Sequence, residues 1–258
     1  MKHLLPFSSP PPSGEVLLCC VDIPRRLPEE LTARLRRALP EEECARHARF
    51  GDEGAAGEFL CGRALLRTVL STWAPVERRA WRFALNAHGR PGIASPDSTL
   101  HFNLSHTRGM VVLALGCDPW VGVDVERLDR SVRPLEVADR FFSPHEVDGL
   151  RSLPAERHRD RFLALWTLKE AYIKARGMGL ALPLRDFSFS PDASPPSVRF
   201  EPSLGDDESR WRFERVDLDS GHRVAVAAKV PRLTVHLSRL DLEALASHVG
   251  LPHTAGAV

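Results

Sequence analysis

Lysine is scarce in this sequence. Of its 35 basic residues only four are lysines, and the other 31 are arginines. An arginine-rich bias of this kind reflects coding composition, so a single arginine carries little information. A lysine retained against the bias carries more, because a compact ammonium and a planar guanidinium are not interchangeable. Two of the four lysines, Lys169 and Lys174, lie within six residues of each other.

Other features are missing too, and each absence excludes a class of protein. The formal net charge is only +1, without the basic excess of a nucleic-acid binder, so we expect no nucleic-acid partner. The five cysteines are odd in number and show no C-x-x-C spacing, which argues against a disulfide framework and a zinc site. No apolar run approaches the roughly 20 residues of a membrane span, and the first is too short for a secretory signal. We therefore expect a cytoplasmic protein with reduced thiols and no membrane association.

What is present is the composition of a folded protein. The chain has 258 residues, of which 43% are hydrophobic and 27% charged, which excludes a disordered or collagen-like chain. This length suits one large domain or two small ones.

The order of predicted elements indicates an α+β fold with two similar halves that meet near residue 120. In the first half, period and turn residues predict helices over 28–48 and 58–73 and strands over 15–23, 81–85, 100–105 and 109–115. The second half begins with a strand over 120–126. A capping box at Ser143–Glu146 and a helix over 155–176 that stops at Gly177 then precede strands at 187–189, 198–200, 211–216 and 223–230. We divide the chain into a flexible leader (1–14), two halves (15–120 and 121–230) and a C-terminal extension (231–258) whose helical part is 240–249.

Two carboxylates stand out in the strand over 120–126. Asp124 and Glu126 are two positions apart, so both point to one face while Val123 and Val125 point to the core. Two adjacent anions repel unless a positive group holds them, and Mg²⁺ favours carboxylate oxygens together with water and phosphate. The alternative is an exposed strand face at a sheet edge.

A second segment, W-T-L-K-E-A-Y-I-K over 166–174, lies in the long predicted helix. Glu170 and Lys174 are i,i+4 neighbours, which in the plainer interpretation form a surface ion pair. A third segment, F-N-L-S-H-T over 102–107, places Ser105 and His106 at a strand end. Their side chains point apart, so they are no nucleophile–base pair. They could contact a phosphate, or they could simply stabilise a turn.

These three segments, in this order, resemble the 4′-phosphopantetheinyl transferases over about residues 40–230. The length is similar to the surfactin-synthetase-activator type, in which two α/β halves are related by a pseudo-twofold axis. The resemblance implies a monomeric, Mg²⁺-dependent enzyme, with Mn²⁺ as an alternative metal. Such enzymes transfer the phosphopantetheine arm of coenzyme A to a serine of an acyl or peptidyl carrier protein and release 3′,5′-adenosine bisphosphate. Their carriers serve fatty acid, polyketide or non-ribosomal peptide biosynthesis.

The resemblance also implies roles for single residues. By position, the magnesium ligands are Asp124, Glu126 and Glu170. Lys174 matches the lysine near the transferred phosphate, and Lys169, His106 and the adjacent Ser105 match contacts to the phosphates of coenzyme A. Glu170, directly or through a water, is the expected base for the carrier serine, with Lys174 as the alternative.

The adenosine end of coenzyme A is matched less closely. Arg90, in H-G-R-P, matches a basic residue that grips this end, and Arg46 is a weaker match for the 3′-phosphate. Glu43 stands where the family often has a second lysine, so Arg49 or Arg63 could supply that contact instead.

The partner and the rival functions complete these expectations. Carrier proteins are generally acidic, so we expect an arginine-bearing surface near the cleft, with Phe141, Phe142 and the helix from Ser143 as docking candidates. The alternative for the two phenylalanines is the core. A non-catalytic module that binds coenzyme A or carriers is the main rival function, and another Mg²⁺-dependent phosphotransferase or nuclease is a third.

Overall fold

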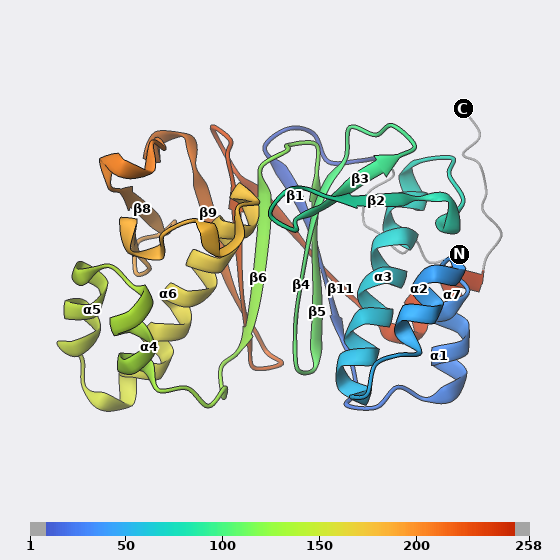
Figure 1. Cartoon of the computed structure of the whole chain (residues 1–258), viewed down its shortest axis with the longest axis horizontal. Helices are drawn as coiled ribbons and strands as arrows, with labels where there is room; N and C mark the ends of the chain where they lie inside the picture. The colour runs from blue at the N-terminus through green and yellow to red at the C-terminus, as the bar shows by residue number, and fades with distance from the viewer. Residues whose placement is uncertain (1–8, 251–258) are drawn as a thin grey trace.

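A computed structural model describes residues 9–250, which form two halves of the same construction (Figure 1). The first half contains β1 (Glu15–Asp22), α1 (Glu29–Arg36), α2 (Glu41–His47), α3 (Glu53–Trp73), β2 (Arg82–Leu85), β3 (Pro91–Ser95), β4 (His101–Thr107) and β5 (Met110–Gly116). The second contains β6 (Val121–Arg127), α4 (Pro134–Phe141), α5 (Pro144–Arg151), α6 (Ala155–Arg176), β7 (Phe187–Ser190), β8 (Ser197–Phe200), β9 (Arg212–Leu218) and β10 (His222–Ala228). The chain then continues through β11 (Thr234–Leu240) and α7 (Leu242–Gly250).

The strand order repeats from one half to the other. In the first sheet β1 pairs antiparallel with β5, which pairs antiparallel with β4. In the second sheet β6 pairs antiparallel with β10, which pairs antiparallel with β9. Each half thus runs strand, long helix, two-stranded hairpin and two further strands, with the last strand in the middle of the sheet. This confirms the predicted α+β class with two similar halves.

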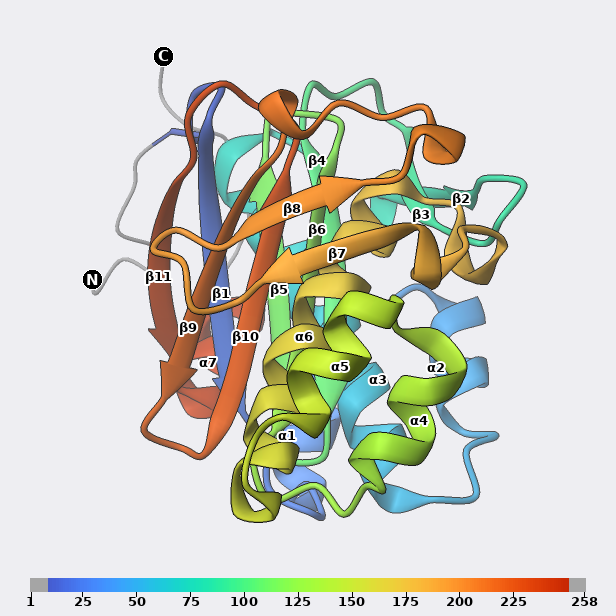
Figure 2. The ribbon, with the colours of Figure 1, turned by 90° about the vertical axis from the view of Figure 1, so that its left-hand side faces the viewer.

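The two sheets pack against each other between two layers of helices (Figure 1). Alternate residues of β1 and β5 join alternate residues of β6 and β10 in one apolar cluster between the sheets. The opposite face of the first sheet packs on α1, α3 and α7, and that of the second on α6. Figure 2 shows α4, α5 and the β7–β8 hairpin on the outer side of α6.

The two halves meet where β4 lies beside β6. These strands belong to different sheets, but the side-chain oxygen of Asn103 on β4 accepts a hydrogen bond from the backbone N–H of Val123 on β6 at 2.9 Å. Asn103 is buried, so this bond replaces a backbone ladder at the junction and fixes the register of the two strands.

The C-terminal segment completes the first half. β11 pairs parallel with β1, and Leu245, Ala246 and Val249 of α7 enter the apolar core beside α1 and α3. Arg34 donates to the Glu243 carboxylate at 2.7 Å and so ties α1 to α7. At the other end, residues 1–8 of the predicted leader and residues 251–258 of the extension lie outside the described residues. None of the helices within residues 9–250 has the length and apolar character that crossing a membrane requires.

Most elements follow the sequence pattern, with some differences. The predicted helix over 28–48 is two helices, because Pro40 lacks a backbone N–H and starts the second of them. The long helix α3 begins five residues before its expected start, where the Asp52 side chain accepts from the backbone N–H of Ala55 at 2.8 Å. The capping box at Ser143–Glu146 and the end of α6 at Gly177, which has φ +63°, are confirmed.

Candidate active site

Three polar side chains from three elements meet at the junction of the halves. Asp124 of β6 accepts a hydrogen bond on Oδ1 from Lys174 Nζ of α6 at 2.6 Å and from Ser105 Oγ of β4 at 3.0 Å. Lys174 also donates to Ser105 Oγ at 2.8 Å, which closes a triangle. Asp124 and Ser105 are buried, whereas the Lys174 side chain keeps 28% of its surface exposed. The structure therefore brings together residues that lie 69 positions apart in the sequence.

Gly122 allows α6 to come this close to β6. A Cβ at this position would lie 2.1 Å from the backbone oxygen of Ala171 and 2.4 Å from the backbone nitrogen of Ala175. Only a residue without a side chain fits there, so the glycine of G-V-D-V-E sets the distance between the strand that carries Asp124 and the helix that carries Lys174.

The carboxylates of Glu126 and Glu170 are close enough to Asp124 for its charge to raise their pKa values. Burial, and then the charge of Asp124, raise the pKa of Glu126 to about 7. The same two causes, in the same order, raise the pKa of Glu170. Arg130 pairs with the Glu126 carboxylate and opposes the shift of both groups. Arg130 was not predicted, because it lies in the turn after β6, where no regular period indicates which side chain meets Glu126.

The donor set at this place suits a hard divalent cation. Oδ2 of Asp124 is buried and has no hydrogen-bond partner, although buried carboxylate oxygens are normally satisfied. The charge of Asp124 raises the pKa of both Glu126 and Glu170, a cation relieves this repulsion, and Mg²⁺ prefers carboxylate oxygens. Within residues 9–250, however, no three acidic, histidine or cysteine side chains are already arranged around a common metal position. Lys174 and Arg130 hold the positive charge beside Asp124 and Glu126 instead, so Glu126 and Glu170 would have to turn to share an ion with Asp124.

His106 lies at the edge of the same junction. Its side chain is 59% exposed, and its Nδ1 is 2.7 Å from Oε2 of Glu58 on α3. This contact uses Nδ1, so Nε2 is the ring nitrogen that a phosphate could contact. Glu58 was not singled out from the sequence, because only the tertiary structure brings α3 beside the end of β4.

Lys169 does not lie at this site, and its assignment as a phosphate contact is corrected. Its side chain is fully buried on another side of α6. The three N–H donors of its ammonium are used by the backbone oxygens of Leu184 at 2.8 Å and Phe187 at 2.6 Å and by the carboxylate of Glu146 at 2.8 Å. Burial lowers its pKa, and the ion pair with Glu146 opposes that shift. Lys169 thus joins α6 to α5 and β7 within the core.

Arg90 links the two halves above the triangle. Its guanidinium donates to the backbone oxygens of Ala175 at 2.7 Å and of Pro119 and Val121 at 3.0 Å each, and burial lowers its pKa. It also lines a pocket of about 390 Å³ between the β2–β3 hairpin, the start of β4 and Pro119. The residue expected at the adenosine end is therefore partly committed to the fold, with the pocket beside it.

The arginines expected at the 3′-phosphate lie near α2 and α3. Arg46 is exposed and lies over the ring of Phe59, with its guanidinium carbon 5.1 Å from the ring centroid. Arg63 pairs with Glu43 at 3.5 Å, and its buried NH1 has no hydrogen-bond partner. Glu43 also accepts from Arg67 at 2.8 Å, so the carboxylate is neutralised. Arg49 is exposed.

The two phenylalanines expected at a docking surface differ. Phe142 is only 1% exposed and stacks on Phe162 in the second core, which excludes it as a surface contact. Phe141 is partly buried and meets Trp166 edge to face at 6.3 Å between ring centroids.

A family model and similar curated proteins point to one family. A model of the 4′-phosphopantetheinyl transferase superfamily matches residues 120–227. The chain is 32% identical over 224 residues to the 4′-phosphopantetheinyl transferases ffp of Bacillus subtilis and Sfp of Bacillus subtilis (strain 168), covering 86% of this chain and 96% of each relative. It is 38% identical over 162 residues to the 4′-phosphopantetheinyl transferase HetI of Nostoc sp., covering 62% and 68% of the two chains. Among solved structures, holo-[acyl-carrier-protein] synthase of Thermotoga maritima aligns with a TM-score of 0.35 at 23% identity, over 44% of this chain and 64% of that one.

Proposed function

The chain belongs to the 4′-phosphopantetheinyl transferase superfamily and is an enzyme of that activity, and we propose that its reaction uses coenzyme A and Mg²⁺. The arm is transferred to a serine of an acyl or peptidyl carrier protein, and 3′,5′-adenosine bisphosphate leaves. We place the protein in the cytoplasm. It acts as a monomer, since one chain already contains both halves of the repeated fold.

One observation carries the proposal: Asp124, Ser105 and Lys174 meet where the two halves join. The junction between the halves thus holds a carboxylate, a hydroxyl and an ammonium, which together form a site for a charged, phosphorylated substrate. The orphaned Oδ2 of Asp124 and the raised pKa values of Glu126 and Glu170 favour a bound cation there. When bound, Mg²⁺ supplies positive charge to the leaving phosphate.

The residues of this chain have distinct tasks in the transfer. Lys174, held by Asp124 and Ser105, presents its remaining N–H to the transferred phosphate and offsets the charge that grows on it. His106, oriented by Glu58, offers Nε2 to the pyrophosphate from the other half. Glu170 accepts the proton of the carrier serine, because burial and Asp124 raise its pKa toward that of a working base. No residue becomes covalently modified, and positioning provides much of the rate.

The adenosine end of coenzyme A is placed in the pocket beside Arg90, which combines polar and apolar walls. We assign the 3′-phosphate to Arg46 and Arg63, whose guanidinium groups both lie over the ring of Phe59. Arg63 also lies over Phe83 of β2 and retains a buried N–H without a hydrogen-bond partner. Neutralisation of Glu43 by Arg63 and Arg67 removes the repulsion that this carboxylate would otherwise exert on a phosphate. Acidic carriers would be attracted by exposed arginines near the junction, such as Arg130, whose side chain is 42% exposed beside Glu126.

The test is to incubate the protein with coenzyme A, Mg²⁺ and several apo carrier proteins and to weigh the carriers. Each accepted carrier gains the mass of the phosphopantetheine arm, and 3′,5′-adenosine bisphosphate appears in equal amount. Asp124→Ala nearly abolishes transfer while the protein stays folded, because the lost carboxylate repels its acidic neighbours. Glu29→Ala, which removes an exposed carboxylate from α1, is the control and transfers normally. Wild-type activity that is unchanged by removal of divalent metal would refute the metal assignment.

The rival is a module that binds coenzyme A or carriers without chemistry. The intact set of Asp124, Glu126, Glu170 and Lys174 favours the enzyme. Binding of coenzyme A without mass gain on any carrier would favour the module instead.

A further inference from the structure

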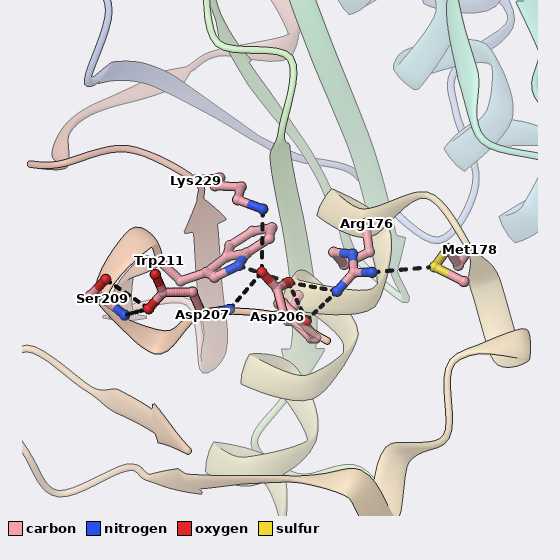
Figure 3. Close-up of polar contacts among 8 residues, drawn as sticks. Arg176, Met178, Asp206, Asp207, Ser209, Trp211 and Lys229 are labelled. Carbon is pink, nitrogen blue, oxygen red and sulfur yellow. Dashed lines mark hydrogen bonds and ion pairs between the residues drawn. The ribbon is translucent and has the colours of Figure 1, made fainter. Parts of the chain in front are cut away.

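A second polar cluster surrounds Asp206 (Figure 3). Asp206 lies between β8 and β9, and its side chain is only 4% exposed. Its Oδ2 accepts from Arg176 at 2.5 Å, Tyr172 at 2.8 Å and Trp211 at 2.9 Å. Its Oδ1 accepts from Lys229 at 3.2 Å and from the backbone N–H of Asp207 at 2.9 Å. One carboxylate thus receives five donors.

These donors belong to the elements that carry the proposed metal ligands. Tyr172 and Arg176 lie on α6, each two residues beyond Glu170 or Lys174, which turns them by roughly 200° to the opposite face of the helix. Arg176 also donates to the hydroxyl of Tyr172 at 2.7 Å, so the last turns of α6 are held at two points.

On the other side the cluster reaches β6 and β10. Lys229 directly follows β10, in which Ala225 pairs with Asp124 of β6. The backbone N–H of Lys229 donates to the oxygen of Trp120 at 3.1 Å, and its ammonium lies 5.6 Å from the ring centroid of Trp120, one residue before β6 begins. The contact from Asp206 to Lys229 therefore fixes the sheet that carries Asp124 and Glu126.

From these contacts we infer that Asp206 is a positioning residue: it fixes α6, with Glu170 and Lys174, relative to β6, with Asp124 and Glu126. Gly122 sets how closely the helix approaches the strand, whereas Asp206 sets how far the helix can slide or rotate along it. A site whose carboxylates come from two elements binds its cation tightly only if those elements keep their relative position. This inference rests on the metal site of the proposed function.

A purely structural role would look different in experiment. Any loss of a buried, multiply bonded carboxylate lowers stability, so thermal unfolding alone does not separate the two roles. Metal affinity separates the two roles, because it changes only if α6 can move relative to β6. Two neighbours of Asp206 provide the contrast. Lys229 makes the link from Oδ1 to the sheet. Trp211→Phe removes only the N–H that donates to Oδ2 and keeps an aromatic ring beside Tyr172 and Lys229.

The experiment is a titration of the folded protein with Mn²⁺ alone, in which free Mn²⁺ is counted by electron paramagnetic resonance. Asp206→Asn and Lys229→Met raise the Mn²⁺ dissociation constant about tenfold, the lower end of the effect of removing groups that orient metal ligands. Trp211→Phe lowers the unfolding temperature but changes the dissociation constant less than twofold. Leu245→Ala, which opens a cavity in the core under α7, controls for general destabilisation and leaves Mn²⁺ binding unchanged.

In the transfer assay, Asp206→Asn raises the Mg²⁺ concentration for half-maximal rate by the same factor, and saturating Mg²⁺ restores kcat with KM for the carrier unchanged. A wild-type dissociation constant for Asp206→Asn, or an equal increase for Trp211→Phe, overturns the inference while the metal site stands. If Asp206→Asn does not fold, Lys229→Met decides by the same criterion. Wild-type protein that binds no Mn²⁺ overturns the metal site of the proposed function, and this inference with it.

Discussion

Replacing Gly122 by alanine tests whether the approach of α6 to β6 controls the activity. The added Cβ would lie 2.1 Å from the oxygen of Ala171, about 1.3 Å short of the 3.4 Å at which ordinary contact begins. Both obstructing groups are backbone atoms of a helix, so no side chain can turn away to make room. The helix must therefore move outward by about an ångström and carry Glu170 and Lys174 with it.

The size of the effect follows from that displacement. Overfilling a packed contact costs roughly 1–3 kcal/mol of stability. A shift of about 1 Å in catalytic groups costs about 100-fold in rate. We therefore expect Gly122→Ala to fold with a lower unfolding temperature and to transfer phosphopantetheine about 100 times more slowly, as measured by mass spectrometry of an apo carrier.

Two other glycines provide controls. Gly149 of α5 has open space where its Cβ would lie, so Gly149→Ala keeps full activity and gains slightly in stability. At Gly116 of β5, four residues along the strand from the partner of Ser105, a Cβ would lie 2.9 Å from the oxygen of Glu15. Gly116→Ala therefore loses stability but keeps the rate at saturating coenzyme A. Folded Gly122→Ala with activity within threefold of wild type would show that helix approach does not limit catalysis.

Three further outcomes are expected. Lys169→Met leaves the Glu146 charge buried without its partner and lowers the free energy of unfolding, measured in urea, by about 3–5 kcal/mol. The folded fraction keeps its KM for coenzyme A, whereas a raised KM at full stability would restore the phosphate role. Burial would raise the pKa of Asp206, but its hydrogen bonds and Arg176 lower that pKa below the ordinary 3.8. Asp206→Asn therefore loses the most stability relative to the wild type above about pH 4, and the difference shrinks in more acidic buffer. Glu58→Gln weakens the hold on His106, which raises KM for coenzyme A by about tenfold with an unchanged unfolding temperature.

Local sequence signals predicted local structure well. The capping box of α5 and the glycine stop of α6 depend on residues three or four positions apart, so the chemistry that forms them is visible in the sequence. The strand β11 was not predicted because its outer edge is unpaired and its residues are half exposed, which leaves only a weak alternation. Its partner β1 lies more than 200 positions away, and no local pattern encodes such a pairing.

Because local patterns do not encode contacts between elements, they also could not predict that Lys169 is buried. Helical periodicity showed that Lys169 and Glu170 point in different directions, but not which of them faces the core. That choice depends on α5 and β7, which pack on α6 and supply the acceptors for the Lys169 ammonium. Arg90 is a similar case, because its carbonyl acceptors come from the other half of the chain.

The sequence by itself determined the chemistry of the site. Alternation in β6 places Asp124 and Glu126 on one face, helical spacing in α6 pairs Glu170 with Lys174, and the family follows from these motifs. Only the tertiary structure decided that Ser105, Asp124 and Lys174 share one set of hydrogen bonds and that Asp206 braces the helix from behind. The physical reason is range: backbone periodicity fixes directions within one element, whereas distances between elements are set by packing contacts such as Gly122 against Ala171.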